Sequence, residues 1–326
     1  MTPLFGHDSA VAAFRDSLAS GRLHHAWLIS GPAGIGKALF ADKAALRVLA
    51  EGQGRVDLPG LDVPDDHPAA RLVAAGSHPD LARLERLPRE SGAGELARGI
   101  SVEQVRGLAR LFTTTASMSP WRVVVIDAID DLERPAANAL LKNLEEPPPQ
   151  SLFLLVSHAS ERLLPTLRSR CRQLRLSALS DDAMTSALKA ALPDASEREI
   201  AELVGGGQGC PGRALALQGL DIAGLDRAML ELAREGDPTN ARRSALAQSL
   251  ALKSAQPRYE AFLARAPSIV AAEAKRRRGA ALAEALTTWE RAHGLAASAA
   301  HLSLEPESVV FELSGMIASL APGRAP

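Results

Sequence analysis

Cysteine is nearly absent from this sequence: Cys171 and Cys210 are the only two among 326 residues. Two thiols can build neither a disulfide framework nor a four-thiolate zinc site, so we expect a reducing, cytoplasmic setting. Aromatic residues make up only 3% of the chain, whereas hydrophobic residues make up 46%. The core that this composition allows is therefore aliphatic and rich in alanine, which favours helices.

Long apolar runs and an excess of basic residues are also missing. No apolar stretch reaches the roughly 18 residues that span a bilayer, and the N-terminus lacks the regions of a signal peptide, so we expect no membrane segment. The formal net charge is -1, from 37 Lys and Arg against 38 Asp and Glu. Proteins that hold DNA alone usually carry a clear basic excess, so autonomous nucleic-acid binding is not expected.

The first half of the chain alternates short apolar runs with helical patterns. This alternation predicts an α/β domain with a parallel sheet covered on both faces. The predicted strands are 25–30, 122–127, 152–157 and 171–176. Helices are predicted after the first strand, from the capping box of Ser101 and Gln104, and from Pro135 to Glu146.

The second half contains only helical patterns. Asp181–Asp182 and the pair Ser196 with Glu199 predict the caps of two short helices, and a third should begin near Pro211. Glu235–Gly236–Asp237–Pro238 is typical of a linker. The sequence thus predicts three domains: an α/β domain (1–177), a small three-helix lid (178–236) and a C-terminal helical bundle (237–326). Residues 51–78 lack periodicity, and we interpret them as an irregular insertion.

The segment GPAGIGKA, from Gly31 to Ala38, carries the strongest motif. Seven of its eight positions fit the phosphate-binding loop G-x-x-x-x-G-K-[ST], between a strand and a helix as that motif requires. Gly31, Gly34 and Gly36 allow several N–H groups to point into one concavity, and Lys37 would reach the outer phosphates. The alternative is a glycine-rich turn with a chance lysine.

The residues needed for hydrolysis are incomplete. Phosphoryl transfer needs Mg²⁺, which the hydroxyl of this loop helps to hold, and Ala38 has none. Asp127 ends the second predicted strand, where the acidic half of the site should lie, but Ala128 follows it instead of a glutamate that activates water. We interpret Asp130 and Asp131 as solvated or helix-capping groups. The sequence therefore predicts a degenerate site without self-catalysed hydrolysis.

Four segments together resemble the AAA+ clamp-loader family, and they are most similar to its bacterial delta-prime subunits. They are RLHHAWLISGPAGIGKA, GSHPDL, VVVIDAIDDLERPAANALLKNLEEPP and LLPTLRSRC. The resemblance covers nearly the whole chain and is strongest between residues 22 and 176. It implies an ATPase-type domain, a helical lid and a helical collar that closes a ring of five subunits.

The same resemblance gives a role to Ser169, Arg170 and Cys171. In this family the Ser-Arg-Cys motif lies at the subunit boundary, and its arginine reaches into the nucleotide site of the neighbour. A guanidinium delivered in this way raises phosphoryl-transfer rates about 10³–10⁵-fold. We therefore expect Arg170 to act in trans. The alternative is a local ion pair with an acid such as Glu161.

Two further positions match sensors of the family less clearly. Ser157 ends the third strand, where a polar residue elsewhere detects the terminal phosphate; it could equally be satisfied by nearby backbone. Arg213 lies near the lid arginine of active members, although an exposed helix arginine is the plainer interpretation.

Zinc is not expected. Several delta-prime relatives carry a four-cysteine zinc module between the loop helix and the His-Pro-Asp segment, but residues 50–80 contain no cysteine. No cofactor is required by this interpretation, and ATP or ADP would bind weakly if at all.

The resemblance implies a non-hydrolysing subunit of a replicative clamp loader. Its partners would be motor subunits of the gamma/tau type and a delta-type subunit, with the sliding clamp and primed DNA reached through the complex. Two alternatives stay open: an active AAA+ ATPase, such as a motor subunit or a helicase relative, and a nucleotide-binding scaffold adaptor outside replication.

Overall fold

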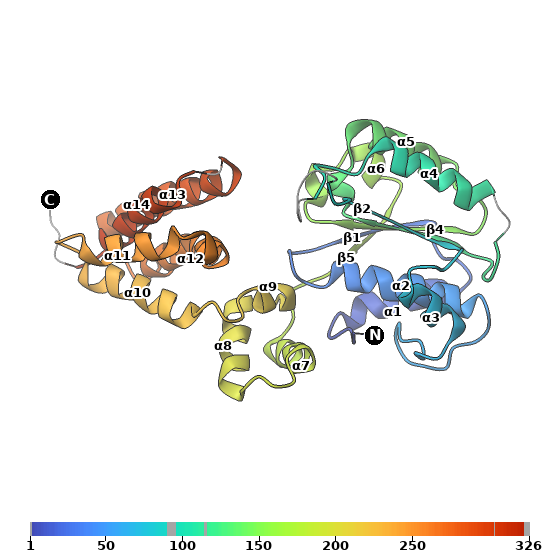
Figure 1. Ribbon diagram of the computed structural model, residues 1–326, viewed down its shortest axis with the longest axis horizontal. Helices are drawn as coiled ribbons and strands as arrows, with labels where there is room; N and C mark the ends of the chain where they lie inside the picture. Colours follow the sequence, from blue (N-terminus) through green and yellow to red (C-terminus); the bar gives the residue numbers. More distant parts are fainter. Residues whose placement is uncertain (1, 90–95, 114–115, 303, 323–326) are drawn as a thin grey trace. The chain divides into compact units, whose positions relative to one another are not determined.

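The structure is a computed structural model that describes residues 2–89, 96–113, 116–302 and 304–322. Its contacts divide the chain into two compact units, Met1–Arg213 and Ala214–Pro326. The first unit holds the sheet, and the described residues of the second form helices and their connections (Figure 1). The predicted three-part division stays a prediction, because the boundary between the two units falls inside the predicted lid.

Five parallel strands form the sheet, in the order β2-β3-β4-β1-β5. They are Ala26–Ser30 (β1), Leu81–Glu85 (β2), Arg122–Asp127 (β3), Ser151–Ser157 (β4) and Arg172–Arg175 (β5). The parallel sheet confirms the predicted α/β class, and four strands begin and end within one residue of the prediction. The pattern misses β2, an edge strand in which only Leu84 is buried.

Helices cover both faces of the sheet (Figure 1). One face carries α1 (Asp8–Ala19), α2 (Lys37–Glu51) and α3 (Pro68–Ala74); the other carries α4 (Val102–Thr113), α5 (Arg134–Glu145) and α6 (Pro165–Arg168). Alternate residues of β3 enter the two cores: Val123 and Val125 join the first, and Val124 and Ile126 join the second. A strand buried on both faces produces this alternation, which explains its continuous apolar sequence. Single 3-10 turns follow β3 and β4, at Ile129–Asp131 (η1) and Ser160–Arg162 (η2).

Three short helices come next: α7 (Asp181–Ala191), α8 (Glu197–Gly207) and α9 (Pro211–Ala216). The hydroxyl of Ser196 accepts a hydrogen bond from the backbone N of Glu199 at 3.2 Å, which confirms the predicted cap of α8. The predicted cap of α7 is wrong by one residue. Ser180 accepts the capping bond, and the two aspartates lie in the first turn, where the helix dipole favours negative charge.

The C-terminal unit is a helical bundle, as predicted. It comprises α10 (Ile222–Glu235), α11 (Ala241–Leu250), a 3-10 turn at Lys253–Ala255 (η3), α12 (Gln256–Ala274), α13 (Gly279–Leu302) and α14 (Pro306–Ala318). Apart from Tyr259 and Phe262, the buried side chains of its core are aliphatic or methionine. Asp237, in the predicted linker, is buried and accepts a backbone hydrogen bond from Arg243 at 3.0 Å, so that turn is fixed between α10 and α11.

The predicted insertion takes its shape from one fully buried side chain, Arg47 of α2. The guanidinium donates to the carboxylate of Glu51 at 2.8 Å. It also donates to three backbone carbonyls, those of Val56 (2.8 Å), Leu58 (2.9 Å) and Asp62 (2.6 Å). The stretch from Val56 to Asp62 is irregular because its backbone bonds to a side chain rather than to a neighbouring strand or helix turn. For the later part of the insertion the prediction is wrong, because Pro68–Ala74 form the helix α3.

Among the residues that the structure describes, no helix has both the length and the apolar character to cross a membrane.

Candidate functional site

The glycine-rich loop connects β1 to α2, as the sequence predicts. Gly31, Gly34 and Gly36 have φ angles of 148°, 75° and 101°, values that residues other than glycine rarely adopt. At Gly31 a side chain would also collide with the chain, because an added Cβ would lie 2.5 Å from the carbonyl oxygen of Leu176. The turn therefore requires these glycines whatever the loop binds.

Lys37 is directed back onto the loop. Its Nζ donates to the carbonyl oxygens of Gly31 and Pro32, each at 2.8 Å, and the residue is only 3% exposed. Burial lowers the pKa of Lys37, although the carboxylates of Asp130 and Asp127 act in the opposite direction. Two of the three N–H donors of the ammonium are therefore engaged within the loop.

The first turn of α9 contacts the tip of the loop directly. The backbone N of Gly212 donates to the carbonyl oxygen of Gly34 at 2.8 Å, and an added Cβ on Gly34 would lie 2.6 Å from the backbone N of Arg213. The side chain of Arg213 is exposed and donates to Gln208 at 2.8 Å. Its predicted sensor role stays a prediction; the described contact is made by its backbone instead.

Asp127, at the end of β3, is held by an arginine. Nη2 of Arg83 donates to Oδ2 of Asp127 at 3.0 Å, and the same guanidinium bonds Glu85 at 2.9 Å and Asp42 of α2. Burial raises the pKa of Asp42, which Arg83 opposes and the charge of Asp127 reinforces. One guanidinium thus serves three carboxylates at the edge of the sheet where a metal-binding acid was expected.

Ser157 also has a partner within the chain. Its hydroxyl donates to Oδ1 of Asp130 at 3.0 Å, and the residue is fully buried. The same carboxylate accepts the backbone N–H groups of His158 at 2.6 Å and Ala159 at 3.2 Å. Asp130 was interpreted as solvated or helix-capping; that is wrong, because it fixes the turn after β4 and engages Ser157.

These residues do not fit a divalent cation. Mg²⁺ in a phosphate-binding loop needs the loop hydroxyl and a free strand-end carboxylate. Ala38 offers a methyl group, Asp127 is paired with Arg83, and Asp130 is committed to three donors. Nor do the described residues gather three His, Cys, Asp or Glu side chains in an arrangement that could hold a metal.

Arg170 lies on the turn between α6 and β5 and is partly exposed. Its Nη2 pairs with Oε1 of Glu145 at 2.7 Å, and its Nη1 donates to the carbonyl oxygen of Thr166 at 2.8 Å. A local acid does bind this arginine, as the alternative proposed, but it is Glu145 of α5 rather than Glu161. Ser169 donates to the same carbonyl at 3.1 Å, so the turn is tightly bonded.

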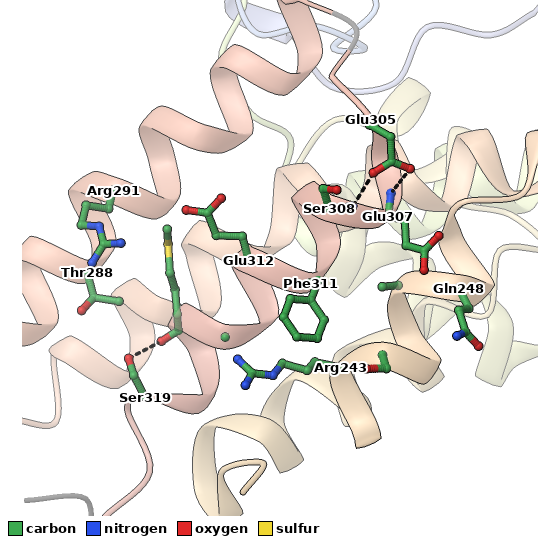
Figure 2. A pocket seen from close by; sticks show the side chains of 14 residues that line it. Arg243, Gln248, Thr288, Arg291, Glu305, Glu307, Ser308, Phe311, Glu312 and Ser319 are labelled. Carbon is green, nitrogen blue, oxygen red and sulfur yellow. Dashed lines mark hydrogen bonds between the residues drawn. The ribbon is translucent and has the colours of Figure 1, made fainter. Parts of the chain in front are cut away.

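A hollow in the C-terminal unit is a second candidate for a functional site. It has a volume of about 820 Å³ and lies between α11, α13 and α14 (Figure 2). The guanidinium of Arg243 lies over the ring of Phe311, 4.6 Å from its centre, and the carboxylate of Glu305 caps α14 through the backbone N of Ser308 at 2.7 Å. These two polar groups stabilise the helices of the bundle.

Sequence reasoning placed the loop, Asp127, Ser157 and Arg170, but it missed the residues that engage them. Arg83 and Glu145 are charged residues on regular elements, and nothing in their local sequence separates them from solvated side chains. For Arg83 there was no signal, because the strand that carries it, β2, was itself not predicted.

The family described as "DNA polymerase III, delta subunit" matches residues 6–180. The DNA polymerase III subunit delta' of Pseudomonas aeruginosa is 37% identical over 198 residues, which are 61% of this chain and 57% of that protein. The subunit tau of Escherichia coli is 32% identical over 177 residues, 53% of this chain and 25% of that protein.

Among solved structures, a DNA polymerase III gamma subunit-related protein of Thermotoga maritima aligns over 96% of this chain and 99% of its own, with a TM-score of 0.46 and 11% identity. The chain spans about half the length of the curated delta-prime relatives that it matches. Because the family match extends over more than half of the chain, the chain belongs to the family described as DNA polymerase III, delta subunit, and the resemblance to delta-prime subunits predicted from its motifs is confirmed.

Proposed function

We propose that this chain is a non-hydrolysing subunit of delta-prime type in the bacterial DNA polymerase III clamp loader. In DNA replication it would support the loading of the sliding clamp onto primed DNA. Family membership supports the assignment. Its partners would be gamma/tau-type motor subunits and a delta-type subunit in a ring of five, with the C-terminal bundle as its part of the collar. Clamp and DNA would be reached through that ring.

The observation that carries the loss of hydrolysis is the pairing of Arg83 with Asp127. An active site needs the strand-end carboxylate to be free for a divalent cation, and a guanidinium at 3.0 Å is already paired with this one. Ala38 and Ala128 remove the hydroxyl and the water-activating acid as well. With the carboxylate paired and both the hydroxyl and the acid absent, the site of this chain should not hydrolyse ATP. The same three differences should leave any binding of ATP or ADP weak.

The catalytic contribution of the chain is Arg170, with Ser169 and Cys171 forming its turn. In the transition state of phosphoryl transfer, negative charge spreads over the oxygens of the transferred group. A planar guanidinium meets two such oxygens with a fixed, parallel pair of N–H groups, a geometry that an ammonium lacks. A subunit without hydrolysis of its own can therefore control the hydrolysis of its neighbour by presenting this side chain.

Replacing Arg170 with alanine is expected to leave ring assembly intact and to lower the DNA-stimulated ATPase of the reconstituted complex. The loss should equal the contribution of the one motor site that this arginine serves, because that site slows about 10³-fold or more. The measurement is steady-state phosphate release by complexes assembled with motor subunits, a delta-type subunit, clamp and primed DNA. Arg162→Ala, an exposed arginine eight residues earlier, is the matched control. Unchanged ATPase in the Arg170→Ala complex would remove the role in trans.

Ala38→Thr is expected to leave the purified chain without ATP turnover. The substitution restores the loop hydroxyl, but Asp127 stays paired with Arg83 and Ala128 still offers no acid. Phosphate release in the presence of ATP and Mg²⁺ measures the turnover, and the rate of Lys37→Ala gives the background to be subtracted. Turnover by the wild-type chain that disappears in Lys37→Ala would show that the site is active after all.

A further inference from the structure

The backbone on both sides of Arg170 is anchored to the core. Leu167 is 2% exposed and packs in the same cluster as Leu144 of α5. Cys171 packs against that cluster, its Sγ donates to the carbonyl oxygen of Leu167 at 3.2 Å, and burial raises the pKa of its thiol to about 11. The thiol is therefore a neutral packing group, and the turn that carries Arg170 has a fixed place on α5.

With the backbone fixed, the direction of the Arg170 side chain depends on its own contacts. A free arginine samples many rotamers, and ordering it costs conformational entropy. Two contacts limit this freedom: Nη2 with Glu145 at 2.7 Å, and Nη1 with the carbonyl of Thr166 at 2.8 Å. They use two of the five N–H donors of the guanidinium and leave three for another acceptor.

We propose that Glu145 is the positioning residue of Arg170: its carboxylate orients the guanidinium so that the unused donors are presented to the phosphates of a nucleotide held by the neighbouring subunit. The inference rests on the proposed function of Arg170 in trans. Glu145 is suited to this task because it is the last residue of α5, so its main chain is held by the helix while its carboxylate reaches the turn.

The expected consequence is catalytic and not structural. An ion pair in which both side chains are a third to a half exposed contributes little to folding, because solvent screens it. A misdirected catalytic group, in contrast, costs up to about 10²-fold in rate. Removing Glu145 should therefore lower turnover while the folded state and the assembly of the ring stay as they are.

The test uses the reconstituted complex and compares five variants of this chain, of which Arg170→Ala is the reference. Glu145→Ala should lower the kcat of DNA-stimulated ATPase by about half or more of the loss seen with Arg170→Ala, with KM for ATP unchanged. Glu145→Gln keeps an acceptor for Nη2 and should restore part of this loss. The double variant Glu145→Ala with Arg170→Ala should have the same kcat as Arg170→Ala alone, because Glu145 acts only through the arginine. Glu146→Gln makes the same charge change at the adjacent exposed residue and should behave as wild type.

A second readout in the isolated chain separates this inference from the role in trans. The ¹⁵N resonance of the Arg170 Nε–H, assigned by its loss in Arg170→Lys, should show a more mobile guanidinium in Glu145→Ala than in wild type. Equal mobility in the two proteins would overturn the positioning role, as would a Glu145→Ala complex with wild-type or higher kcat. If the mobility rises but Arg170→Ala leaves the ATPase unchanged, the proposed function fails and positioning for catalysis fails with it.

Discussion

Replacing Arg47 with methionine is expected to lower the free energy of unfolding of the first unit by about 3–5 kcal/mol. The guanidinium is fully buried, and it supplies one donor to Glu51 and three to the backbone of the insertion. Methionine fills much of the same volume but donates nothing. Each buried carbonyl left without a partner costs about 1–3 kcal/mol. Urea denaturation followed by circular dichroism measures the change.

Arg55→Met is the matched control, because Arg55 belongs to the same insertion and also pairs with a carboxylate. Its side chain is 90% exposed and that of its partner Asp57 is 76% exposed. This variant should therefore change the free energy of unfolding by no more than about 0.5 kcal/mol. Arg47→Lys should remain strongly destabilised, since one ammonium cannot copy the planar arrangement of donors. Arg47→Met with the stability of the control would show that the insertion is held by other contacts.

Local sequence patterns were sufficient to predict the buried strands of the fold. A run such as RVVVID predicts a strand because every side chain of a central parallel strand is buried. β2 has no such run: it lies at the edge of the sheet, and Arg83 and Glu85 occupy two of its five positions. Its strand structure comes from pairing with β3, a contact between residues about 40 positions apart that no local pattern encodes.

The candidate site also has a part that local sequence patterns predict and a part that they do not. The loop was predictable because its glycines and lysine are consecutive and serve one turn. Asp127 and Ser157 were predictable because they end core strands. Their partners were not predictable, since an ion pair such as that of Arg83 with Asp127 depends on which strands become neighbours and how the side chains extend.

Taken together, these contacts describe a site whose polar groups are satisfied from within. Lys37 donates to the carbonyls of its own loop, Asp127 accepts from Arg83, and Ser157 donates to Asp130. In an active member, phosphates and a metal ion would provide these partners. Internal partners would allow the domain to keep its fold without nucleotide, as the proposed non-hydrolysing role requires. Arg170 differs because it is partly exposed and keeps three unused donors.

Gly34→Ala is expected to lower the free energy of unfolding of the first unit by about 2–5 kcal/mol. Two costs combine. A side chain at a φ of 75° costs about 1–2 kcal/mol, and the added Cβ would lie 2.6 Å from the backbone N of Arg213, where overpacking costs a further 1–3 kcal/mol. Backbone atoms cannot rotate away as a side chain can, so the first turn of α9 must move off the loop. Thermal and urea unfolding measure the loss.

Gly36→Ala separates these two costs. Gly36 also has a positive φ, of 101°, but an added Cβ there meets no atom within 4 Å, so this variant should show backbone strain alone. Gly212→Ala tests the same contact from the other side, because its Cβ would lie 2.9 Å from the Cα of Gly34. Since either substitution already breaks the contact, the double variant should be less destabilised than the sum of the two. Two results together would contradict this prediction: equal losses of stability for Gly34→Ala and Gly36→Ala, and additive losses for Gly34→Ala and Gly212→Ala. They would mean that the contact between the loop and α9 contributes nothing to stability.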